Sequence, residues 1–156
     1  MFKKILIPVD GSELALKAAA TGVKLAKEVG AEVVFLHAMA PYIAPYAAEI
    51  SMVDDKTQAM FEKNVADGSS QILANARKVA DAAGVTSESV HAVSSRAEAF
   101  IEKTVKDKNC DLIVIATHGR GAVGRFVMGS VTTRLLPVSP VPVLVYRDAT
   151  MTSDGK

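Results

Sequence analysis

Two unbroken apolar runs constrain most strongly what this chain can fold into. Residues 33–36 (VVFL) and 112–115 (LIVI) carry an apolar side chain at every position. A strand with one face in water alternates apolar and polar residues, so these runs predict strands that are covered on both faces. Such strands are typical of a parallel sheet between two layers of helices. The sequence therefore favours an α/β fold.

Five segments are short, rich in β-branched residues and bounded by turn residues, which predicts strands. They are residues 4–9, 32–38, 89–93, 111–116 and 141–146, of which 89–93 has the weakest pattern. Helical periodicity fills the intervals between them. Strand and helix then alternate to a final strand, which predicts a parallel sheet with right-handed crossovers and helices on both faces.

Capping signals mark the ends of the expected helices. Ser12 is placed to cap the first helix, which ends at Gly30. The second helix runs over about residues 56–84, and the fourth over about 130–136. Ser95 and Glu98 have the spacing of a capping box, which predicts the start of the third helix. Residues 39–55 fit no element, and this segment is either a lid or partner surface or an ordered surface connection.

Composition limits the class of protein further. A chain of 156 residues with 49% hydrophobic residues has the size and apolar content of one domain. Its net charge of +1 comes from 18 basic and 17 acidic residues spread along the chain, so we expect neither a nucleic acid nor a membrane surface as partner. Residues 148–156 are expected to be a polar C-terminal tail.

Cysteine and hydropathy indicate the compartment. Cys110 is the one cysteine, so no intrachain disulfide can form, and its place beside an apolar run predicts a packing role. The apolar run at the N-terminus is too short for a signal peptide, and no segment reaches the roughly 18 apolar residues of a membrane span. We therefore expect a cytoplasmic protein.

His37 and His91 lie on expected strands, where they should satisfy local polar groups, and no metal site is predicted.

A glycine-rich turn follows the fourth expected strand and matches two familiar phosphate-binding motifs imperfectly. Residues 119–124 (GRGAVG) have the dinucleotide spacing G-x-G-x-x-G, but the next helix is expected only at Ser130 and no acidic residue ends the next strand. The same span resembles a P-loop, but Arg125 and Phe126 stand where lysine and a hydroxyl residue are required. A Rossmann dehydrogenase and a P-loop NTPase are therefore both disfavoured.

A longer motif through this turn matches a known pattern better than the two short motifs do. Thr117-His118-Gly119 is followed after nine residues by Gly129-Ser130. Together with the opening ILIPVDGS, the VVFLH strand, the DLIVI strand and the closing PVPVLV, this combination resembles the universal stress protein family over nearly the whole chain. The resemblance implies one domain over residues 1–147. It also implies an open five-stranded parallel sheet in the order 3-2-1-4-5, a Rossmann-like fold of the adenine nucleotide alpha hydrolase type.

The ATP-binding branch of that family has a nucleotide motif of glycine, two residues, glycine, nine residues, glycine and a hydroxyl residue. Gly119, Gly129 and Ser130 satisfy its second half, whereas Ala116 stands in place of the first glycine. The added methyl group lies where backbone would pass close to the ribose. This departure leaves open whether nucleotide binding is retained.

The residues of the turn are suited to binding a phosphate by their own chemistry, independently of the family resemblance. Gly119, Gly121 and Gly129 allow backbone N–H groups to turn toward an anion, and the helix N-terminus at Ser130 and Val131 adds unpaired N–H groups. Ser130 would then be both N-cap and phosphate donor, or the N-cap alone.

The resemblance assigns further contacts to the strand ends. Asp10 would hydrogen-bond the adenosine, while Pro8, Val9 and Ala38 would line the base; Asp10 could otherwise be a turn former only. The candidate set is completed by four residues around the fourth strand: Ala116, Thr117, His118 and Arg120.

The resulting hypothesis is a stress-response regulator that binds ATP, with Mg²⁺ arriving on the nucleotide, and in which the nucleotide orders residues 122–128. No nucleophile or carboxylate motif supports catalysis. Two alternatives stay open: a universal stress protein that does not bind ATP and works through protein contacts, and a slow ATPase or self-phosphorylating protein. The family also implies a homodimer, paired through the apolar last strand Val141-Pro142-Val143-Leu144-Val145.

Overall fold

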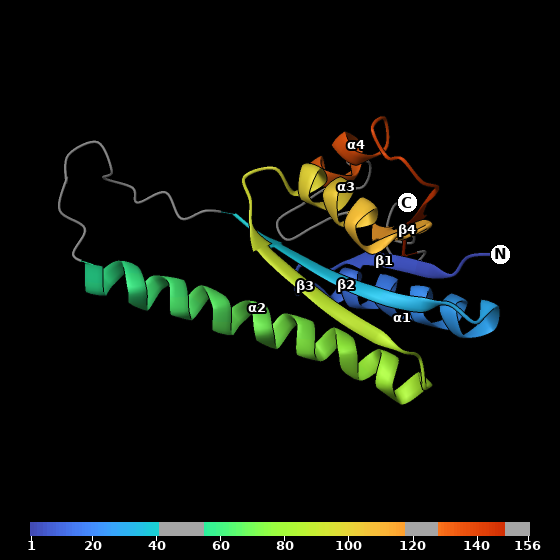
Figure 1. The fold of residues 1–156 in the computed structure, drawn as a ribbon, viewed down its shortest axis with the longest axis horizontal. Helices are drawn as coiled ribbons and strands as arrows, with labels where there is room; N and C mark the ends of the chain where they lie inside the picture. Colours follow the sequence, from blue (N-terminus) through green and yellow to red (C-terminus); the bar gives the residue numbers. More distant parts are fainter. Residues whose placement is uncertain (41–54, 118–127, 149–156) are drawn as a thin grey trace, which may run out of the picture.

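The computed structural model describes residues 1–40, 55–117 and 128–148. Strands and helices alternate through these residues as the sequence predicts (Figure 1). In chain order the elements are β1 (Lys4–Pro8), α1 (Glu13–Val29), β2 (Glu32–Met39), α2 (Asp55–Ala83), β3 (Ser87–Val93), α3 (Ala97–Lys108), β4 (Leu112–Ala116), α4 (Ser130–Leu135) and β5 (Val143–Tyr146).

The strands form a single parallel sheet in the order β3-β2-β1-β4-β5, which confirms the predicted fold class. In β1, Ile5 lies beside Val33 of β2 and beside Leu112 of β4. The three strands in the middle of the sheet, β2, β1 and β4, are those with the most continuous apolar sequence. The edges are β3 and β5.

Each face of the sheet is covered by its own pair of helices (Figure 1). On one face, alternate strand residues such as Ile7 and Phe35 pack with α1 and α2. On the other, Leu6 and Val34 pack with α3 and α4. All four side chains are 0% exposed, which confirms that the unbroken apolar runs are buried on both sides.

The ends of α1 follow the predicted capping. The Ser12 side chain accepts a hydrogen bond from the Ala15 amide at 3.1 Å, and Gly30 ends the helix with φ of 72°. A left-handed residue at this place favours glycine, because a Cβ is disfavoured there.

The capping box predicted at Ser95 is wrong. The helix α3 begins after Arg96, which makes no side-chain capping bond. Instead, Ser94 Oγ accepts from the Arg96 amide at 3.1 Å and donates to the Arg96 carbonyl at 3.0 Å. The Glu98 carboxylate instead forms ion pairs with two arginines, Arg96 and Arg134 of α4.

Asp148 departs from its expected role, whereas Cys110 agrees with it. Asp148, expected in the polar tail, is only 7% exposed, and its carboxylate accepts from Lys17 Nζ at 2.7 Å. This contact ties the chain beyond β5 to α1. Cys110 is buried as predicted, and burial raises the pKa of its thiol to about 11, which keeps it protonated and unreactive. In the described ranges no helix is long and apolar enough to span a membrane.

Candidate functional site

The carboxyl ends of β1 and β4 form the place where the sheet reverses its order. The chain leaves β1 for α1 on one face, while α4, the helix that follows β4, packs on the other face. Parallel α/β sheets bind ligands at such a switch point, because the two connections diverge and leave the strand ends open. The candidate residues from the first and fourth strands therefore converge on one location.

The strand registers bring three of these residues to one level. Pro8 lies beside Leu36, and Leu6 lies beside Ile113. Continuing the same offsets by a few residues places Asp10 level with Ala38 on one side and with Thr117 on the other. Segments far apart in the sequence thus meet at the end of the sheet, as predicted.

Asp10 forms the turn after β1. Its Oδ1 accepts a hydrogen bond from the Ser12 amide at 2.9 Å, and Gly11 between them has φ of 81°. This is the turn-forming role expected of an aspartate beside glycine and serine. Contact with a ligand is a separate prediction. Val9 is buried and donates to the Leu36 carbonyl at 2.8 Å, and Pro8 is half-buried.

Three hydrogen bonds connect the end of β4 with its neighbours. The Ala116 carbonyl accepts from Thr132 Oγ1 at 3.0 Å, and Ala116 is 6% exposed. The Thr117 amide donates to the Tyr146 carbonyl at 2.9 Å, and the Thr117 carbonyl accepts from the Gly129 amide. The start of α4 is therefore held against the end of β4 through two separate contacts.

The capping role predicted for Ser130 is wrong. Gly129 has the extended backbone of an N-cap, with φ of −54° and ψ of 148°, and Ser130 is the first residue of the helix. A residue that already has helical backbone angles cannot cap, since the N-cap must lie outside the helix. Ser130 is exposed at this end of α4, and Val131 is half-buried against the core.

The remaining candidates, His118, Gly119 and Arg120, lie outside the described residues, as does the segment 122–127. Two grooves in the described ranges lie away from these candidates, one between α2 and β3 and one beside α1 and β5.

Thr132 was missed by sequence reasoning. It is 2% exposed on α4, and its role depends on a carbonyl 16 residues earlier in the chain. A threonine near the start of a short helix is unremarkable in sequence, so no local signal could have identified the contact.

The histidines have different environments. His37 is 8% exposed, and its Nδ1 lies 2.8 Å from Ser69 Oγ of α2, which confirms the predicted structural role. His91 was expected to be similar, but it is exposed and makes no hydrogen bond within the described ranges. The reason is its position: β3 is an edge strand, so His91 has the neighbouring strand β2 on one side only.

Comparison with protein-family models gives a match to the universal stress protein family over residues 1–147. The chain belongs to this family. The match covers every strand and helix that the structure describes, and it leaves out only the residues from Asp148 onward.

Individual universal stress proteins resemble the chain along most of its length. A universal stress protein of Thermus aquaticus is 32% identical and universal stress protein YxiE of Bacillus subtilis is 30% identical; each alignment covers 94% of this chain and 100% of the relative. Among solved structures, the universal stress protein UspA of Lactobacillus plantarum superposes with a TM-score of 0.74 at 23% identity, covering 94% of this chain and 98% of that one.

Some structural neighbours in the family contain an adenine nucleotide. An Arabidopsis thaliana family protein with AMP bound has a TM-score of 0.67 at 16% identity, covering 97% of each chain. A universal stress protein of Archaeoglobus fulgidus in complex with dAMP has a TM-score of 0.61 at 17% identity, covering 94% and 98%. At these identities the likeness establishes the shared fold.

Proposed function

We propose that this universal stress protein binds an adenine nucleotide, ATP in the cell, across the carboxyl ends of β1 and β4. The proposal is supported by the parallel registers of β1 with β2 and β4, which, when continued past the strand ends, put Asp10, Ala38 and Thr117 level at the switch point of the sheet, where parallel α/β folds accept ligands. The base and ribose would lie over Pro8, Val9 and Ala38. The phosphates would lie toward Gly129 and the exposed Ser130.

The nucleotides named in the family structures support the choice of ligand. AMP and dAMP share only the adenine base and a sugar phosphate, so adenine is the common element that a family site would recognise. Mg²⁺ would arrive on the phosphates of ATP, since those oxygens are ligands that it prefers.

Isothermal titration calorimetry with ATP, AMP and GTP tests this function. We expect both adenine nucleotides to bind and GTP to bind more weakly. Asp10→Asn keeps an oxygen that can accept from Ser12 but removes the charge, and it should weaken adenine-nucleotide binding by about tenfold. Asp107→Asn, an exposed carboxylate on α3, is the matched control and should leave the affinity unchanged.

Two results would count against the proposal. Absence of binding heat for every nucleotide at millimolar concentration would favour the alternative function, a family member that works through protein contacts, which the alanine at position 116 keeps open. Equal affinities of the wild type and Asp10→Asn would place the nucleotide elsewhere on the protein.

We further propose that two copies pair through β5. This strand lies at an edge of the sheet, and Leu144 on it is 37% exposed. An apolar edge strand that stays uncovered promotes uncontrolled association, and pairing with a second copy removes that edge. Nucleotide binding to such a dimer would alter the surface that partner proteins recognise.

A further inference from the structure

A groove between α2 and β3 lies at the edge of the sheet opposite to β5. Its volume is about 420 Å³, within the range of roughly 300–1,000 Å³ that is usual for small-molecule sites. Strand β2 separates it from β1, so it is distinct from the nucleotide site proposed above. The polar side chains that line it come from both elements: Ser70, Arg77 and Asp81 from α2, and Ser89 and His91 from β3.

The floor of the groove is polar where the neighbouring strand is apolar. Ser89 of β3 pairs in register with Phe35 of β2, and Ser87 pairs with Val33. Because residues at one level of adjacent strands point to the same face, the two serines share the face on which Phe35 packs under the helices.

Ser89 is the one of these two serines that lines the groove. Its Oγ, like that of Ser87, is buried and has no hydrogen-bond partner among the described residues. A buried hydroxyl without a partner destabilises the fold, so such groups are uncommon, and one that lines a groove is available to bind a ligand. The hydroxyl can turn about χ1 to reach a group in the groove, since serine has three staggered rotamers.

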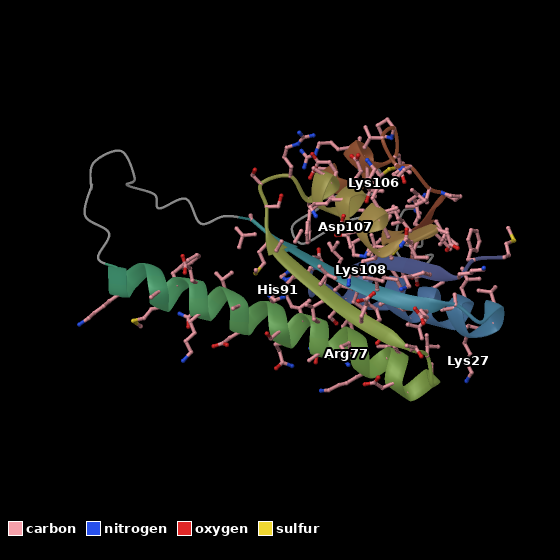
Figure 2. The ribbon with its side chains drawn as sticks, in the orientation of Figure 1. Lys27, Arg77, His91, Lys106, Asp107 and Lys108 are labelled. Carbon is pink, nitrogen blue, oxygen red and sulfur yellow. The ribbon has the colours of Figure 1, made fainter. Side chains whose placement is uncertain are left out.

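The wall formed by α2 supplies charge and space. Ser70, Ala74, Arg77 and Asp81 follow each other at helical spacing on one side of the helix, and the two small residues leave the groove open. In the part of the chain that is described, Arg77 has no carboxylate within ion-pair distance, although Asp81 is one turn away. Figure 2 shows Arg77 on α2 and His91 on β3.

We propose that the α2–β3 groove binds a small phosphate monoester that also carries hydroxyl groups. The planar guanidinium of Arg77 matches two phosphate oxygens, and Ser89 and His91 supply further donors from the strand. Asp81, one turn beyond Arg77 on α2, accepts hydrogen bonds from the hydroxyl groups of the ligand. Ser70 is a further donor from the helix.

Titration of the full-length protein with inorganic phosphate and with glycerol 3-phosphate, followed by amide chemical shifts in NMR spectra, tests the site. We expect saturable shifts in residues 70–77 and 87–93, with tighter binding of the ester than of phosphate. Arg77→Gln should weaken binding by about tenfold, the loss expected for one charged hydrogen-bonded contact. Lys78→Gln makes the same charge change on the adjacent exposed residue of α2 and should leave the affinity unchanged.

Ser89→Ala separates binding from folding. Removal of a hydroxyl that has no partner should not lower the midpoint of urea unfolding, but it should weaken phosphate binding several-fold. Non-saturable shifts, equal effects of Arg77→Gln and Lys78→Gln, or shifts confined to the neighbourhood of Asp10 and Gly129 would each overturn the proposal. So would a Ser89→Ala variant that binds as well as the wild type.

Discussion

At the scale of the residue, Glu98 is a buried carboxylate that links two helices. It is 4% exposed and lies 3.2 Å from Arg96 Nε of its own helix end and 3.4 Å from Arg134 Nε of α4. The contact with Arg134 is an ion pair without hydrogen-bond geometry. A hydrogen bond from its own amide, followed by the charges of the two arginines, holds the pKa of Glu98 below its usual value, although burial opposes this shift.

Glu98→Gln should therefore show a stability difference that depends on pH. A carboxylate whose pKa is lowered by folding stabilises the protein above its unfolded pKa, and this contribution disappears as the pH falls through the folded pKa. We expect the variant to lose unfolding free energy at neutral pH, because it loses the charge that pairs with both arginines. The loss should be only about 1 kcal/mol, because the arginine side chains are exposed to solvent, which weakens the ion pairs. Below pH 4.5, the ordinary pKa of a glutamate, the stability difference between Glu98→Gln and the wild type should shrink.

Urea unfolding followed by circular dichroism, repeated from neutral to acid pH, measures this difference. The control is Glu28→Gln, which changes an exposed carboxylate on α1. A deficit of Glu98→Gln that stays constant down to the acid limit would show that the charge of Glu98 does not stabilise the fold.

At the scale of the element, α4 depends on a contact with the strand before it. Thr132→Val removes the hydroxyl that donates to the Ala116 carbonyl and leaves that carbonyl unsatisfied. We expect a loss of about 1–2 kcal/mol of unfolding free energy, together with weaker nucleotide binding, because the start of α4 is no longer held at the sheet end. Thr133→Val is the matched control: Thr133 is exposed and donates to Met128, so its change should be below about 0.5 kcal/mol.

The helices α1 and α2 respond differently to the same substitution. A Cβ added at Gly22 of α1 would lie 2.6 Å from Ile7 Cδ1, whereas nothing lies within 4 Å of a Cβ added at Gly68 of α2. Gly22→Ala should lower the unfolding free energy by about 1–2 kcal/mol, because Ile7 is fully buried and must shift. Gly68→Ala should raise it by about 0.5–1 kcal/mol, since alanine favours the helix.

Chemical denaturation of the two glycine variants provides the measurement. If both variants changed stability in the same direction, close packing of α1 on β1 would not be the reason that glycine is present at position 22.

At the scale of the whole molecule, the two edges of the sheet provide a test of assembly. Leu144→Glu places a charge on β5 and should convert the proposed dimer to a monomer, as measured by light scattering at micromolar concentration. Val93→Glu makes a similar change on β3, where Val93 is 58% exposed, and should leave the mass unchanged. A monomeric wild type would contradict the dimer, and disruption by Val93→Glu alone would move it to the other edge.

The arrangement of the whole sheet was largely predictable from local pattern. Unbroken apolar runs indicated strands buried on both sides, and the order of elements required parallel crossovers. The cap at Ser12 and the glycine end at Gly30 were also predictable, because both act on residues within one helical turn. The strand order came from the family resemblance.

The candidate site was predictable in part. Asp10 and Thr117 end their strands, so a parallel sheet had to bring them to one edge. The false capping role of Ser130 arose because a hydroxyl residue after glycine fits the pattern equally well as the cap or as the first helical residue. Local sequence does not distinguish these two positions.

The sequence by itself determined the elements of this protein, their parallel orientation and the edge at which the candidate residues collect, because periodicity, turn chemistry and chain connectivity are local. Only the tertiary structure decided which polar groups are partners. Thr132 meets Ala116, and Lys17 meets Asp148, which is 131 residues away. Among the described residues, Ser89 Oγ has no partner on the face where Phe35 is buried. These outcomes depend on burial between distant segments, which no local pattern encodes.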